Sequence, residues 1–112
     1  MRIYKILPRE DWEAALTAGL YKGSPLDLTD GFIHLSTATQ AQETASRHFR
    51  AREGLVVLEI EADDLGAALT WEPSRGGDLF PHLYGALDVG LVRGVAEAPL
   101  DPNGVPLIGA LR

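Results

Sequence analysis

The chain has 112 residues, of which 46% are hydrophobic and 23% charged, as in an ordinary soluble globular protein. It contains no cysteine, which excludes disulfide scaffolds, zinc ribbons and thiol chemistry. Sixteen acidic and ten basic residues give a net charge of −6, which disfavours non-specific nucleic-acid binding and a polybasic membrane anchor. The length predicts one domain over residues 1–112. Charges interrupt the N-terminus and no long apolar stretch occurs, so a cytoplasmic protein without a membrane segment is predicted.

The first half of the chain predicts two strands, each followed by a helix. In order these are a strand at Arg2–Leu7, a helix from Pro8 to Gly19, an irregular loop over residues 20–30, a strand at Gly31–Leu35 and a helix that ends at Gly54. The strands follow from apolar alternation. Pro8 suits a first helical turn, where its missing N–H is not needed, and Thr37 to Gln40 has the spacing of a capping box. Gly, Ser, Pro and Asp predict the loop.

The second half predicts mostly strands. They lie at Leu55–Ile60, Ala67–Glu72, Phe80–Gly85 and Val89–Ala96, with a last edge strand at Leu107–Ile108. The first of these is largely aliphatic, which is typical of a central strand. The order indicates an α+β fold in which two N-terminal helices pack on a mixed, mostly antiparallel sheet. A doubly wound dinucleotide-binding fold is disfavoured, because no G-x-G-x-x-G follows the first strand.

Polar residues near the end of the second predicted strand could line a cleft. Alternation places His34 and Ser36 on one strand face, directly before a helix N-terminus whose free amides suit an anionic group. The structural alternative is a histidine bonded to backbone, with Ser36 or Thr37 serving only as a helix cap.

A second polar segment surrounds His82. Pro81 stiffens the backbone before it, and in an extended segment His82 and Tyr84 share a face. Polar aromatic residues in a constrained loop often line clefts, although an aromatic cluster that closes the sheet would explain them too. The remaining histidine, His48, is interpreted as structural.

Other sequence patterns give little support for a metal site or for a catalytic site. The spacing of the three histidines matches no compact metal motif, so no metal site is predicted, and the G-x-S-x-G motif of serine hydrolases is absent. Glu59 and Glu61 share a strand face and could grip a ribose, but the solvent side of a strand explains them more simply. Asp30 and Asp78 are interpreted as turn residues whose side chains bond local backbone.

Five segments together resemble a small bacterial family named only as domain of unknown function 952. In chain order they are Ile3-Tyr4-Lys5-Ile6, Trp12, the segment from Asp30 to Thr37, Trp71-Glu72-Pro73 and the segment from Phe80 to Gly85. The resemblance covers nearly the whole chain. It implies a fold similar to the catalytic domain of ADP-ribosyltransferases. Some members are labelled glutathione S-transferase domain proteins, although this chain is too short for the two domains of such transferases.

The resemblance also implies a site. In ADP-ribosyltransferases a His or Arg on the first strand holds the ribose of NAD, and relatives often have Tyr-His where this chain has Tyr4-Lys5. No residue matches the transferase glutamate. We therefore expect a polar cleft that binds a nucleotide-like or anionic small molecule, with His34 and His82 as candidate catalytic residues. The candidate ligand-binding residues are Lys5, Ser36, Thr37 and Tyr84. The cofactor stays open, with NAD as the implied candidate.

Two other functions are kept as alternatives. One is NAD-dependent ADP-ribosyl transfer or NAD glycohydrolysis in the same cleft. The other is a non-catalytic structural or partner-binding protein.

Overall fold

The computed structural model describes residues 1–109, apart from the side chain of Arg75. Its longer elements are the strands β1 (Arg2–Pro8), β5 (Leu55–Glu61), β6 (Leu69–Pro73), β7 (Leu79–Leu83) and β9 (Val92–Glu97), with the helices α1 (Arg9–Ala18), α2 (Pro25–Asp30) and α3 (Ala38–His48). Short strands are β2 (Leu20–Tyr21), β3 (Ile33–His34), β4 (Ser36–Thr37) and β8 (Leu87–Asp88). Three 3-10 helices are η1 (Ala62–Ala68), η2 (Arg75–Gly77) and η3 (Val89–Leu91).

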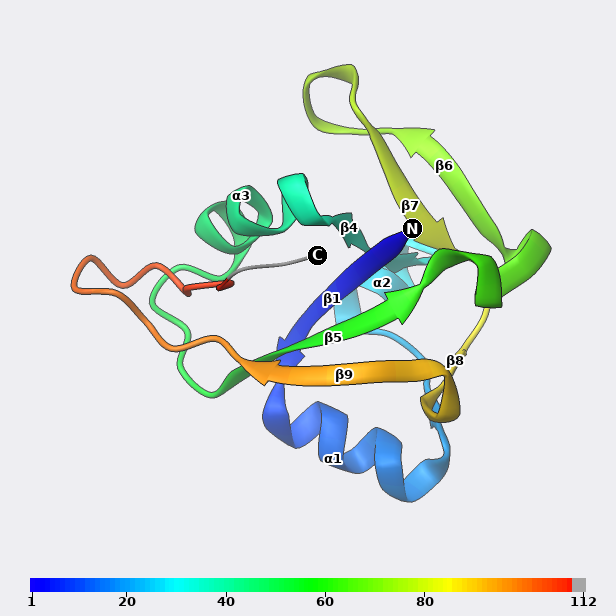
Figure 1. The fold of residues 1–112 in the computed structure, drawn as a ribbon, viewed down its shortest axis with the longest axis horizontal. Helices are drawn as coiled ribbons and strands as arrows, with labels where there is room; N and C mark the ends of the chain where they lie inside the picture. The colour runs from blue at the N-terminus through cyan, green and yellow to red at the C-terminus, as the bar shows by residue number, and fades with distance from the viewer. Residues whose placement is uncertain (110–112) are drawn as a thin grey trace.

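A four-stranded sheet in the order β4-β1-β5-β9 lies between α1 and α3 (Figure 1). β1 pairs with β5 along its whole length, from Arg2 opposite Glu61 to Pro8 opposite Leu55. β5 also pairs with β9, so the predicted central strand is confirmed. A second sheet, β2-β8, has only two strands.

Alternation along β1 and β5 divides the core between two faces of the sheet. The cluster that includes α1 contains Ile3, Leu7, Trp12, Ala15 and Val56. The cluster that includes α3 contains Tyr4, Ile6, Ala41, Ala45 and Val57. Full burial of each large aliphatic side chain contributes about 1.5–3 kcal/mol. β1 is therefore held rigidly from both sides, and so is Lys5 in its middle.

The histidine segments lie on the third sheet, in the order β3-β7-β6. Its β6–β7 hairpin extends away from the rest of the molecule (Figure 1). The register between β3 and β7 places His34 directly opposite His82. The expected proximity of these two side chains is thereby confirmed.

The α+β class is confirmed, but the prediction differs from the structure at residues 20–30. This segment contains β2 and α2 rather than an irregular loop, so residues 1–109 contain three α-helices. Ser24 and Asp27 form a capping box, in which Ser24 Oγ accepts from Asp27 N and Asp27 Oδ2 accepts from Ser24 N. All pairings described are antiparallel, so the expected mixed sheet is not observed among residues 1–109.

Three element boundaries also differ. The strand predicted at Gly31–Leu35 is divided into β3, which pairs with β7, and β4, which pairs with β1. α3 begins at the predicted cap, where Gln40 Oε1 accepts from Thr37 N, but it ends at His48 rather than at Gly54. Leu107–Ile108 forms no strand, and an isolated bridge joins Leu100 to Pro106 instead. Within residues 1–109 no helix is both long and apolar enough to span a membrane.

Candidate functional site

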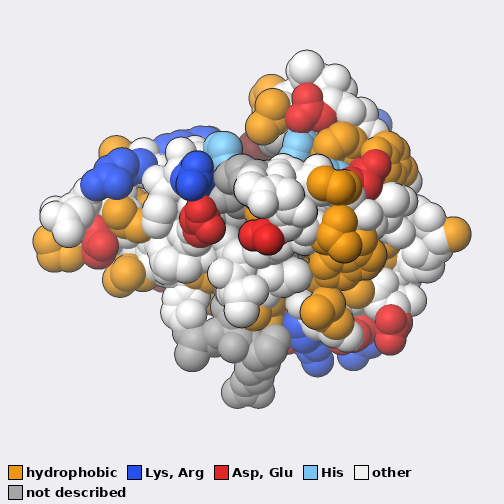
Figure 2. All heavy atoms as spheres, turned by 90° about the horizontal axis from the view of Figure 1, so that it is seen from above, with side chains coloured by type: hydrophobic (Ala, Val, Ile, Leu, Met, Phe, Trp, Pro, Cys, Tyr) orange, Lys and Arg blue, Asp and Glu red, His pale blue; other side chains and the backbone are white. Residues whose placement is uncertain are grey.

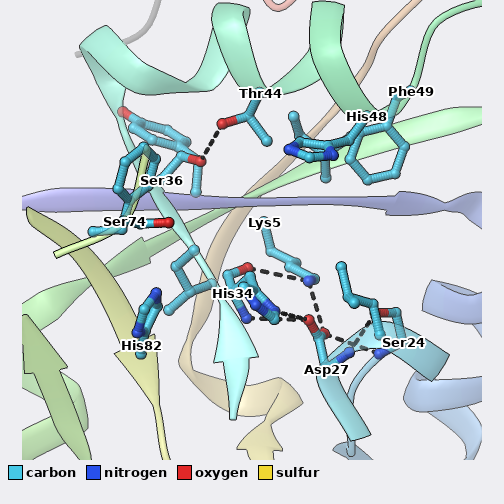
Figure 3. Close-up of a pocket in the computed structure, with 15 residues that line it drawn as sticks. Lys5, Ser24, Asp27, His34, Ser36, Thr44, His48, Phe49, Ser74 and His82 are labelled. Atoms are coloured by element: carbon cyan, nitrogen blue, oxygen red, sulfur yellow. Dashed lines mark hydrogen bonds and ion pairs between the residues drawn. The ribbon is translucent and has the colours of Figure 1, made fainter. Parts of the chain in front are cut away.

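A pocket of about 250 Å³ lies among β1, α2, α3, β7 and the segment that joins β3 to β4. Figure 3 shows Lys5, Asp27 and His34 joined by bonds on one side of it, with Thr44 and His48 on α3. On the face seen in Figure 2, histidine side chains are visible at the surface. His34 lines the pocket and its side chain is 33% exposed, so the pocket combines a polar cluster with contact to solvent.

Lys5 is the buried cation of the pocket. Only 5% of the residue is exposed, and its Nζ donates to Asp27 Oδ2 at 2.8 Å and to the His34 carbonyl oxygen at 3.1 Å. An ammonium group has three N–H donors, so one of them has no partner among the described residues. Burial lowers the pKa of Lys5, and the attraction of Asp27 opposes that shift.

Asp27 is the buried anion beside it, with 2% exposed. Its two oxygens accept four hydrogen bonds, from Lys5 Nζ, from the backbone N–H groups of Ser24 and His34, and from the His34 ring. Burial raises the pKa of this carboxyl, but the bonds from His34 and Lys5 outweigh burial and leave the pKa well below its ordinary value. Asp27 is thus an ionised carboxylate without spare hydrogen-bonding capacity.

His34 has a carboxylate beside each ring nitrogen. Nδ1 lies 2.6 Å from Asp27 Oδ1, and Nε2 lies 3.0 Å from Asp30 Oδ2. Both ring nitrogens of His34 therefore lie against carboxylates, with a hydrogen bond at Nδ1. The expectation that Asp30 bonds local backbone is wrong, because its carboxylate lies against this ring.

His82 is bonded at one ring nitrogen only. Its Nδ1 lies 2.8 Å from Glu72 Oε1, and Tyr84 Oη donates to the same oxygen at 2.8 Å. These two bonds hold the pKa of Glu72 below its ordinary value, and the bond to Glu72 raises the pKa of Tyr84. The Nε2 of His82 has no partner among the described residues.

Phe32 connects the two histidines. Its ring stacks on His82 at a centroid distance of 4.0 Å and an interplanar angle of 24°, and lies 4.6 Å from the His34 ring. The ring of Tyr84 is 5.3 Å from Phe32. The aromatic cluster considered for this segment therefore exists, and it fixes the plane of His82 at the pocket wall.

The remaining predicted site residues are not all in the pocket. Ser36 lines it, with its Oγ 3.1 Å from Thr44 Oγ1. Thr37 lies outside the pocket lining at the start of α3. Tyr84, 44% exposed, also lies outside the lining, and it is connected to His82 through Glu72 and Phe32.

Three further expectations can be compared with the structure. Glu59 and Glu61 form ion pairs with Arg2, and Glu61 also with the N-terminal amine, in keeping with the simpler interpretation. Within the described residues no group of three or more His, Asp or Glu side chains is arranged to hold a metal ion. His48, interpreted as structural, lines the pocket.

Sequence reasoning missed Asp27 and did not single out Phe32 as a site residue. Ser24-Pro25-Leu26-Asp27 has the Ser-x-x-acid spacing of a capping box with proline at the first helical position, and this signal could have revealed α2. It would not have revealed that the capping carboxylate also binds Lys5 and His34.

The sequence model of the family described as Protein of unknown function (DUF952) matches residues 6–95. The chain belongs to this family. The resemblance stated from its motifs is therefore confirmed, and DUF952 itself carries no activity in its description.

Solved structures of one bacterial protein are very similar to this chain. The X-ray structure of protein CC0527 from Caulobacter crescentus has 53% sequence identity to this chain. The match covers 97% of this chain and 96% of CC0527, with a TM-score of 0.95. The solution NMR structure of the same protein is 54% identical, with coverages of 96% and 93% and a TM-score of 0.87. No curated protein matches the chain.

Proposed function

We propose that the pocket of this DUF952 chain binds a nucleotide-like or anionic small molecule. The observation that carries the proposal is the Lys5 ammonium, which is buried in the pocket wall with one N–H donor unused. Apolar residues in place of a buried ion pair are often equally or more stable, so stability alone does not explain Lys5 with Asp27. An acceptor oxygen of a ligand would complete the bonds of Lys5.

The rest of the lining supports a ligand with a flat ring. Tyr4, Phe49 and Phe80 provide aromatic surface, and Ser36 provides a hydroxyl. Pockets for complete small-molecule ligands usually measure about 300–1,000 Å³. At about 250 Å³ this pocket suits one ring with an attached acidic or carbonyl group, or one end of a larger nucleotide.

NAD stays a candidate ligand, and the ADP-ribosyltransferase-like fold stays part of the proposal. Glycosidic cleavage of NAD usually depends on an anion that stabilises the positive charge developing on the ribose. Asp27 is the carboxylate of the pocket lining, and its four hydrogen bonds leave it no free lone pair to offer. Binding is therefore favoured over NAD glycohydrolysis or ADP-ribosyl transfer.

Thermal-shift and titration measurements with NAD, AMP, nicotinamide and inorganic phosphate test the proposal. A ligand at 100 times its dissociation constant adds about 2.7 kcal/mol to the free energy of unfolding, which raises the melting temperature by several degrees. Lys5→Met should abolish the shift measured against its own unliganded form.

Lys22→Met is the matched control, because Lys22 is exposed and does not line this pocket. The control should bind like the wild type. The proposal is wrong if none of the four compounds shifts the wild type, or if Lys5→Met keeps the full shift.

A further inference from the structure

The two ring nitrogens of His82 are in different situations. Nδ1 is 2.8 Å from Glu72 Oε1, and a carboxylate can only accept, so Nδ1 carries a proton. In the neutral ring Nε2 therefore keeps its lone pair. Nε2 has no partner among the described residues, and His82 lines the pocket. A residue of the pocket lining thus carries a proton acceptor without a partner among the described residues.

This acceptor is held in a fixed orientation. His82 is 6% exposed, its backbone pairs with both β3 and β6, and Phe32 stacks on its ring at 4.0 Å. Glu72 is itself fixed by the hydroxyl of Tyr84. A carboxylate that fixes the tautomer of a histidine and stabilises its charged form is the arrangement used in general acid–base catalysis.

The neighbours of His82 strengthen this assignment. The titratable groups that face it are Glu72, Tyr84 and His34, whose ring centroid is 5.6 Å away. Both ring nitrogens of His34 lie within 3.0 Å of a carboxylate, Nδ1 of Asp27 and Nε2 of Asp30, so neither faces a bound molecule alone. Among these groups, only His82 lines the pocket with a ring nitrogen that no described carboxylate faces.

We propose that His82 accepts a proton from a molecule bound in the pocket, with Glu72 and Tyr84 as positioning residues. The proton passes from an acidic C–H of that molecule to Nε2, and the C–H electron pair stays on the molecule. The imidazolium keeps its bond to Glu72. The negative charge develops on an oxygen of the bound molecule, which accepts a hydrogen bond from the unused N–H of Lys5. The proposal rests on the proposed function only in that the molecule enters the same pocket.

The probe for this activity is 5-nitrobenzisoxazole, a flat bicyclic molecule with one acidic C–H. A base takes that proton, the C–H pair forms the nitrile, and the N–O bond breaks with its pair to oxygen, giving a coloured phenolate. We expect the wild-type protein to catalyse this elimination with saturation kinetics, above the rate in buffer.

His82→Phe should lower kcat/KM at least about 100-fold, because a positioned base contributes 10²–10⁴-fold in rate. Phenylalanine keeps a ring for Phe32 to stack on, and circular dichroism verifies that the variant is folded. Glu72→Gln should lower kcat less than His82→Phe does and should leave KM nearly unchanged, because Glu72 orients the base but does not line the pocket.

Glu97→Gln is the matched control, since Glu97 is an exposed carboxylate at the end of β9 that pairs with Arg9 of α1. It should leave kcat and KM for the probe unchanged. A wild-type rate equal to that in buffer, or an undiminished rate in folded His82→Phe, overturns the proposal. If nucleotides bind but the probe is not converted, only the proton transfer is wrong. If the probe is converted and the nucleotides do not bind, only the proposed function is wrong.

Discussion

The two histidines that face each other across β3 and β7 have opposite environments. His34 is hydrogen-bonded to Asp27, which also binds the buried ammonium of Lys5, and its other ring nitrogen lies 3.0 Å from Asp30. His82 has one carboxylate, Glu72, which is about one-third exposed, and keeps one nitrogen free. We call the first group the Lys5–Asp27–His34 cluster and the second the His82–Glu72–Tyr84 cluster.

The comparison shows how burial separates stability from reactivity. In the first cluster each charge depends on a partner, because an unpaired charge in the interior costs several kcal/mol. In the second cluster solvent reaches Glu72 and Tyr84, so losing a partner there costs little. The first cluster therefore builds the wall of the pocket, and the second keeps a ring nitrogen without a partner among the described residues.

The largest effect is expected for Asp27→Asn. This change leaves the Lys5 ammonium buried beside an amide, and removing one partner of a buried ion pair costs about 3–5 kcal/mol. Urea denaturation at pH 7 measures the loss. Asp11→Asn is the control, because Asp11 is an exposed carboxylate in the first turn of α1, where it is worth less than about 1 kcal/mol. Equal losses in both variants would show that the first cluster is not structural.

The wild type and Asp27→Asn also test how the contribution of Asp27 to the unfolding free energy depends on pH. The pKa of Asp27 is lower in the folded chain than its ordinary value of 3.8, so the unfolded chain takes up the proton first as pH falls. The stability that Asp27 contributes is therefore complete above that value and is lost at lower pH. The difference in unfolding free energy between wild type and Asp27→Asn should be constant from pH 7 to pH 5 and shrink below pH 3.8. A difference that persists unchanged at pH 2 would contradict this.

The sequence predicted the elements whose pattern is local. β1, α1, α3 and β5 follow from alternation, a first-turn proline and a capping box, and each was found within a few residues of its predicted bounds, apart from the end of α3. α2 was missed because its six residues begin with proline and follow Gly23 and Ser24, a composition that also predicts a loop.

The site residues that could be predicted from the sequence were also those that a local pattern reveals. His34, Ser36, His82 and Lys5 stand out as polar residues in apolar strands, and the structure brings all four to one pocket. The bonds of Asp27 could not be foreseen, because they join residues that are 22 positions apart in one case and depend on how α2 packs. Local patterns give strand faces, but they do not give contacts between elements.

A smaller effect is expected for Ser24→Ala. This removes the hydroxyl that accepts from Asp27 N, and loss of such a cap costs about 1 kcal/mol. The Ser24 backbone N–H still donates to Asp27, so the carboxylate keeps all four of its bonds. Ser46→Ala is the control, because its exposed hydroxyl bonds only a carbonyl within α3. A loss as large as that of Asp27→Asn would mean that Ser24, rather than the ion pair, holds the wall together.

The smallest effect on stability is expected for Glu72→Gln, which makes the same carboxylate-to-amide change in the second cluster. The amide oxygen can still accept from His82 Nδ1 and Tyr84 Oη, and both Glu72 and Tyr84 are in contact with water. Partly exposed ion pairs contribute little to folding. The urea midpoint should therefore match that of Glu97→Gln, while the ring of His82 loses its anionic partner. If Glu72→Gln instead destabilises the chain as much as Asp27→Asn, the His82–Glu72–Tyr84 cluster is structural, and the contrast between the two histidines disappears.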